Sequence, residues 1–190
     1  MHGVRCALLL VGFACACCGG TKREPAPVSP SASTSKAKMS YEFRVLQTPE
    51  RQLMAIHDQA RGGELPQKIR GNLAKVWAYL RANGASTAHN VVVYRVFDLV
   101  NGVMTIDVGV QVESTLPGDG VIVPVTTPGG LVATTVHIGP YDNLGDASSA
   151  LHEFCKSHDH PIDGPTWEEY GDWNDDPAKL RTDVFVRVAR

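Results

Sequence analysis

An internal repeat is the feature of this sequence that most limits how it can fold. The segment TIDVGVQV aligns with RTDVFVRV when Asp107 is placed on Asp183, 76 residues later. The same separation places Tyr94 on Tyr170, and the two halves align without gaps over this region. Such a repeat predicts two copies of one supersecondary unit, packed around a pseudo-two-fold axis.

Each copy is predicted to contain a strand, a helix and two further strands. Apolar residues recur with a helical period over residues 65–83 and again over 142–158. We therefore expect an α+β fold: a duplicated strand-helix-strand-strand module that forms one antiparallel sheet, with both helices packed on one face and a ligand groove at the pseudo-two-fold axis. The strand candidates are RQLMAIHD, NVVVYRVFDL, MTIDVGVQVES, GLVATTVHI, TWEEYGDW and LRTDVFVRV.

The last strand candidate predicts burial on one face of the sheet. Successive side chains of a strand point to opposite faces. The valines at 184, 186 and 188 should therefore pack under the helices, while Asp183, Phe185 and Arg187 face away from them. One-sided burial of this kind is typical of antiparallel sheets.

The start of the chain has the layout of a secretory signal. Residues 1–18 hold one early charge and then the apolar run CALLLVGFACA, which is too short for a bilayer-spanning helix. Cysteines end the run, so we expect a lipoprotein signal with lipid attached to Cys17, or else to Cys15 or Cys18. A plain secretion signal and a misassigned start codon are the alternatives. The lipoprotein interpretation predicts an exported, membrane-anchored protein that faces the periplasm or the cell surface.

Composition separates a tether from a folded domain. Residues 19–39 are rich in Pro, Ser and Ala and contain almost no apolar side chains, so we expect them to be disordered. The folded domain is then residues 40–190. Its remaining cysteine, Cys155, lies on the apolar stripe of a predicted helix and is interpreted as a core residue.

Charge and spacing exclude some partners and cofactors. The chain has a net charge of -2 and no basic run, which argues against nucleic-acid binding. We expect membrane contact only through the lipid anchor, and the sequence does not identify a protein partner. The spacing of Cys155, His158 and His160 matches no zinc pattern, so we expect no metal and no other cofactor.

The candidate site comes from the segment GPTWEEY. In a strand, Glu168 and Tyr170 share a face, and the repeat places them over Val92 and Tyr94. Two symmetry-related tyrosines and one carboxylate are therefore expected in a groove at the axis, a pattern typical of small-molecule sites. Near the strand ends, Phe97 and Trp173 are candidates for the wall of this groove, or for simple packing. Trp167 and His137 are expected to be core residues.

Four motifs together resemble a known family, the GyrI-like small-molecule-binding domain, also called the AraC effector-binding domain. They are DVGVQV, HIGPYDNLGDA, GPTWEEY and DPAKLRTDVFVRV, and the resemblance covers residues 41–190. It implies a duplicated fold that binds bulky, often cationic, apolar compounds, as in multidrug-sensing regulators. The family's central acid corresponds to Glu168, with Tyr170 after it. No helix-turn-helix segment precedes the domain, so we expect a stand-alone member rather than a DNA-binding regulator.

Three functions remain open at this point. The first is binding of bulky apolar, possibly cationic small molecules, with Glu168, Tyr170, Tyr94, Phe97 and Trp173 as ligand-binding residues. The second is hydrolysis of electrophilic, cyclopropane-type compounds with Glu168 as general acid or base, which some members of the family resemble. The third is a protein-interaction domain that uses the groove or the open face of the sheet. Whether the protein is an enzyme is left undecided.

Overall fold

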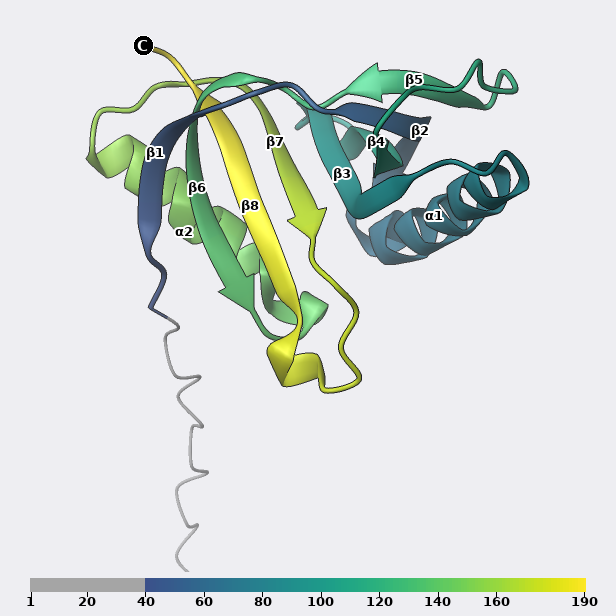
Figure 1. The fold of residues 1–190 in the computed structure, drawn as a ribbon. Helices are drawn as coiled ribbons and strands as arrows, with labels where there is room; N and C mark the ends of the chain where they lie inside the picture. The colour runs from purple at the N-terminus through teal and green to yellow at the C-terminus, as the bar shows by residue number, and fades with distance from the viewer. Residues whose placement is uncertain (1–39) are drawn as a thin grey trace, which may run out of the picture. The chain divides into compact units, whose positions relative to one another are not determined.

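A computed structural model describes residues 40–190, which form an α+β domain (Figure 1). The predicted signal and tether, including Cys15, Cys17 and Cys18, lie outside these residues and stay predictions. Within the described part, neither long helix is apolar enough to cross a bilayer. The main elements are β1 (Phe43–Thr48), β2 (Gln52–Arg61), α1 (Leu65–Ala82), β3 (Thr87–Asp98), β4 (Val103–Val112), β5 (Ile122–Thr126), β6 (Gly130–Ile138), α2 (Leu144–Ser157), β7 (Ile162–Tyr170) and β8 (Arg181–Val188).

The eight strands form one antiparallel sheet in the order β1-β6-β8-β7-β3-β4-β2-β5. Unit 1 is β2-α1-β3-β4, and unit 2 is β6-α2-β7-β8. The two units join through β3 and β7 at the centre of the sheet. This confirms the predicted duplicated module and its antiparallel sheet.

The two edge strands are exchanged between the units. β1 comes directly before unit 1 in the chain but pairs with β6 of unit 2, while β5 comes directly before unit 2 but pairs with β2 of unit 1. The connections to β2 and β6 meet where the Arg51 N–H donates to Thr127 Oγ1 at 2.9 Å. In return, the Thr127 N–H donates to the Arg51 carbonyl at 3.0 Å. The sequence analysis did not predict either edge strand.

Both helices pack on the same face of the sheet, as predicted. Under α2, the valines at 184, 186 and 188 are buried together with Leu151 and Cys155, which confirms Cys155 as a core residue. Under α1, Val76 and Leu80 pack on Met54 and Val110. We call this side of the sheet the helix face and the other side the far face.

The prediction that only one face is buried is wrong at the centre of the sheet. Trp167 on the far face is 1% exposed, and its ring stacks on Phe185 with the centroids 5.0 Å apart. The crossing connections explain this burial, because Arg51 reaches over the far face and its Nη1 donates to Glu169 Oε2 at 2.9 Å. The buried residues of this second cluster are Leu53, Val91, Val93, Val132 and Trp167.

The repeat is also not free of gaps. Val92 pairs with Val108 as Glu168 pairs with Val184, so the strands after each helix keep the offset of 76 residues. In contrast, β2 and β6 are offset by 79 residues, because Met54 pairs with Val110 and Ala133 with Val186. The shorter second helix accounts for the difference, since α2 has 14 residues and α1 has 18.

Candidate functional site

Glu168 lies at the pseudo-two-fold axis. Its Cα is paired in register with that of Val92, which is also its equivalent in the repeat. The axis therefore passes between these two residues, on the helix face of the two central strands. Only one of the two positions carries an acid, and this carboxylate is buried, with Glu168 6% exposed.

Two symmetry-related tyrosines converge on this carboxylate. The Tyr94 hydroxyl donates to Glu168 Oε2 at 2.9 Å, and the Tyr170 hydroxyl donates to the same oxygen at 2.7 Å. The ring of Tyr170 also meets Tyr141 edge to face, with the centroids 5.3 Å apart. The structure thus brings together three of the residues that the sequence singled out, and it adds Tyr141.

The environment of Glu168 favours its neutral form. Burial raises the pKa of the Glu168 carboxyl, and the two tyrosine hydroxyls offset only part of this effect by stabilising the carboxylate. Burial, together with the nearby Glu168 charge, holds the pKa of Tyr94 and of Tyr170 well above the ordinary value, so both hydroxyls are donors. Within residues 40–190, no ion pair joins Glu168 to a cationic side chain.

Each helix is tied to the same floor by one polar contact. On α1, the Trp77 indole N–H donates to Asn90 Oδ1 at 2.8 Å. On α2, His152 Nδ1 lies 2.7 Å from the Ser148 carbonyl and must donate to it, so Nε2 is free to accept from Thr166 Oγ1 at 3.3 Å. Asn90 and Thr166 are equivalent in the repeat and flank the tyrosine pair in register. The surface between the helices is therefore polar at its edges and holds the buried acid at its centre.

The structure places Phe97 and Trp173 apart from this cluster. Phe97 lies near the end of β3 and is 56% exposed. The strand expected over residues 166–173 ends at Tyr170, so Trp173 lies in the following loop, where it is 75% exposed and its indole N–H donates to Asp175 at 3.0 Å. Their role as walls of a ligand groove stays a prediction.

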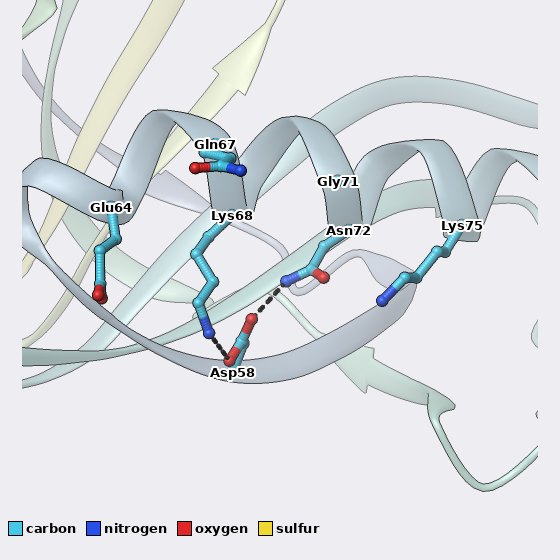
Figure 2. A pocket seen from close by; sticks show the side chains of 7 residues that line it. All are labelled: Asp58, Glu64, Gln67, Lys68, Gly71, Asn72 and Lys75. Carbon is cyan, nitrogen blue, oxygen red and sulfur yellow. Dashed lines mark hydrogen bonds and ion pairs between the residues drawn. The ribbon is translucent and has the colours of Figure 1, made fainter.

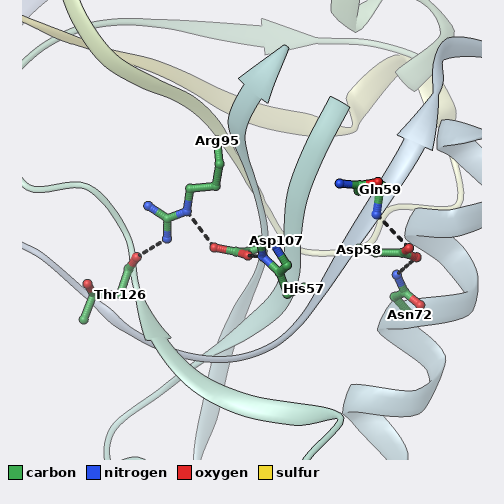
Figure 3. Close-up of polar contacts among 7 residues, drawn as sticks. All are labelled: His57, Asp58, Gln59, Asn72, Arg95, Asp107 and Thr126. Carbon is green, nitrogen blue, oxygen red and sulfur yellow. Dashed lines mark hydrogen bonds and ion pairs between the residues drawn. The ribbon is translucent and has the colours of Figure 1, made fainter. Parts of the chain in front are cut away.

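A polar network on the far face was missed by the sequence analysis. Asp107 is 3% exposed, and it accepts from Arg95 Nε at 2.6 Å and from His57 Nδ1 at 2.7 Å (Figure 3). Arg95 also donates from Nη2 to the Thr126 carbonyl at 2.9 Å. A charged residue on the outer side of a strand carried no sign in the sequence that it would be buried.

Two cavities lie outside the tyrosine cluster. One, of about 440 Å³, lies along α1 beside Asp58, which accepts from Lys68 and Asn72 at 2.9 Å each (Figure 2). The other, of about 300 Å³, lies beside Gly171 and Asp183. Neither is lined by Glu168, so in this state the tyrosine hydroxyls occupy the space next to the acid. The described residues contain no group of three side chains that could hold a metal.

Comparison with known proteins agrees with the fold and with the repeat. The sequence profile of the GyrI-like small molecule binding domain matches residues 41–189. A search of curated proteins gives no match. At the identities found among solved structures, 19% or less for those given below, the likeness establishes the fold alone.

Three solved structures illustrate this likeness. The C-terminal domain of EcmrR matches with a TM-score of 0.69 and 19% identity, covering 80% of this chain and 99% of that chain. EcmrR in its complex with DNA matches with a TM-score of 0.70 and 18% identity over 79% of this chain, which spans only 58% of that longer chain. SAV2435 bound to tetraphenylphosphonium matches with a TM-score of 0.51 and 15% identity, covering 78% of this chain and 94% of that chain. From the profile match, the duplicated fold and these likenesses together, we conclude that the chain belongs to the family of GyrI-like small-molecule-binding domains.

Proposed function

We propose that residues 40–190 bind bulky apolar cations between α1 and α2, with Glu168 as the counter-charge. The observation that carries this proposal is a buried carboxylate at the axis, bonded by two tyrosine hydroxyls and by no cationic side chain of the described residues. A buried acid without a cation is costly, and a cationic ligand removes that cost.

The contacts of the acid suggest how a ligand approaches it. Both hydroxyls bond Oε2, and no hydrogen bond to Oε1 occurs within residues 40–190. A cation would approach Oε1 and favour the ionised form of Glu168. The faces of Tyr94 and Tyr170 would add cation–π attraction of about 0.5–2 kcal/mol each. The tyrosine rings would have to separate to admit a bulky ligand, because neither cavity reaches the acid in this state.

Calorimetric titration of residues 40–190 tests the proposal. All the buried clusters lie within this compact unit, so it is expected to fold alone. The probes are tetraphenylphosphonium and its neutral relative triphenylphosphine oxide. We expect Glu168→Gln to weaken the cation about tenfold or more and to spare the neutral compound, since a charge-assisted contact is lost.

Glu169→Gln is the matched control, because this neighbouring glutamate faces the opposite side of the sheet and pairs with Arg51. It should leave both probes unaffected. Equal losses for the cation and the neutral compound in Glu168→Gln would contradict the electrostatic role of the acid.

A second candidate function is hydrolysis of strained, electrophilic small molecules. It is favoured by one observation: the raised pKa of Glu168 beside two tyrosine hydroxyls suits a general acid. Glu168 would protonate one carbon of the breaking C–C bond, water would add to the other carbon, and the water proton would return to Glu168. Mass spectrometry of a cyclopropane probe incubated with residues 40–190 would then show the gain of one water, lost in Glu168→Gln. An unchanged probe would exclude this reaction for that compound.

A further inference from the structure

The two units differ in how they fill the space next to one equivalent aspartate. In unit 1, Arg95 lies against Asp107 and bridges it to the Thr126 carbonyl, with Nε and Nη2 bonding two different acceptors (Figure 3). The guanidinium thereby fills the space on the far face that the aspartate borders. Asp107 is 3% exposed as a result.

In unit 2 the same space is open. Asp183 is the equivalent of Asp107, and the equivalent of Arg95 is Gly171, which has no side chain. The cavity of about 300 Å³ lies at this place and is lined by both residues. This volume is at the lower end of the range for small-molecule pockets. We call this cavity the unit 2 notch.

The charges around the unit 2 notch do not balance. Its lining includes three carboxylates, from Glu169, Asp172 and Asp183, but only two guanidinium groups, from Arg51 and Arg181. Arg51 pairs with Glu169 at 2.9 Å, and Arg181 donates to both oxygens of Asp183 at 2.7 and 2.9 Å. No hydrogen bond or ion pair with residues 40–190 engages the carboxylate of Asp172. One negative charge is therefore left without a partner.

We infer that the unit 2 notch binds an alkylguanidinium cation, held in the position that Arg95 takes in unit 1. The excess negative charge matches one cation, and the open space corresponds to the missing side chain. A guanidinium suits this place better than an ammonium ion, because its planar array of donors can bond separate acceptors and it is less strongly hydrated. The notch lies on the far face, away from Glu168, so this site is independent of the proposed cation site between the helices.

Substitution of Gly171 gives the sharpest test. Gly171→Arg would supply the guanidinium from the chain itself, as in unit 1, and should abolish binding of added methylguanidinium. Gly171→Ala is the matched control and should retain binding. Gly171 has no left-handed backbone conformation, and an added Cβ would lie 3.2 Å from the Arg181 carbonyl oxygen, so only a small shift is needed. Thermal unfolding of both variants checks that they fold.

Titration calorimetry of residues 40–190 with methylguanidinium, agmatine and methylammonium measures the binding. We expect one guanidinium per domain, weaker binding of methylammonium, and about tenfold weaker guanidinium binding in Asp172→Asn. Asp172 makes no internal contact, so this variant keeps the test valid even where a Gly171 variant does not fold. Glu168→Gln should have no effect, which separates this site from the proposed function.

Two further probes distinguish the source of the guanidinium group. Tighter binding of agmatine than of a Gly-Arg-Gly peptide would indicate a free small molecule, and the reverse would indicate an arginine side chain of a partner; both support a guanidinium site. The inference is overturned by any of three results: no binding of methylguanidinium at millimolar concentration, equal binding of methylammonium, or equal loss in a folded Gly171→Ala.

Discussion

Unit 1 and unit 2 share one backbone plan but place their charges differently. Unit 1 has Val92 at the axis and a buried Asp107 that Arg95 and His57 neutralise. At the equivalent positions, unit 2 has the buried Glu168 and the more exposed Asp183. Where unit 1 has Arg95, unit 2 has Gly171 and an open cavity.

The difference indicates a division of roles between the copies. In unit 1, polar groups are satisfied by the chain's own side chains, which favours stability. In unit 2, one carboxylate is buried without a cation and another cavity carries an excess negative charge. A buried charge that the protein does not compensate is a reason to expect a ligand that does. The predictions below test this division.

The largest expected effect is on the stability of unit 1. Arg95→Ala leaves the buried Asp107 with His57 as its remaining charged partner, and we expect a loss of about 3 kcal/mol in the free energy of unfolding. Arg181→Ala removes the corresponding partner of Asp183, but in that pair the side chains are 55% and 26% exposed, so we expect less than about 1 kcal/mol. Urea unfolding of residues 40–190 measures both. Similar losses would show that the two aspartates are not differently compensated.

A smaller effect is expected on the pH dependence of stability. The pKa of Glu168 is raised in the folded state, so its contribution is fully present below the ordinary pKa of a glutamate and is lost as pH rises through the raised pKa. Glu168→Gln lacks this loss. Its stability relative to the wild type should therefore increase over that pH window and then level off. Urea unfolding at a series of pH values checks this, and a constant difference would contradict a raised pKa.

The smallest effect is expected at the two exposed rings, which are themselves equivalent in the repeat. Phe97→Ser and Trp173→Ser should change stability by no more than about 0.5 kcal/mol, because both side chains are largely exposed. We expect each to weaken tetraphenylphosphonium binding by about 0.5–1 kcal/mol if both rings wall the groove. Val121→Ser is a control at an exposed apolar residue beside the edge strand β5. Affinities unchanged in both variants would remove these rings from the site.

The sequence was sufficient for the features that depend on periodicity. The helices and the six inner strands follow from their apolar patterns, and the match of Tyr94 with Tyr170 located the axis. The edge strands were missed because their patterns are weak: β1 has four exposed residues in a row, and β5 contains Pro124, which is tolerated mainly in edge strands. Their pairing partners also lie in the other unit.

The polar networks depend on details of register that no local pattern reveals. Arg95 lies at an irregularity of β3 between Tyr94 and Val96, where the pairing with β4 shifts. Such a bulge changes the direction of a side chain, and here it accompanies the contact with Asp107. Likewise, the alignment of Tyr94 with Tyr170 predicted a shared face, but the convergence of both hydroxyls on one oxygen requires the register of β3 and β7.

The exchanged edge strands also determine the order in which this domain can form. Phe43 pairs with Thr135, and Gln52 pairs with Thr126, so each edge contact closes a long loop of chain. Loop closure of this kind costs entropy and slows folding in proteins dominated by distant contacts. During synthesis, β1 leaves the ribosome long before β6 exists and has no strand to join until unit 2 is made. Neither unit can complete its own sheet alone, so the duplicated domain is expected to fold and unfold as one cooperative whole.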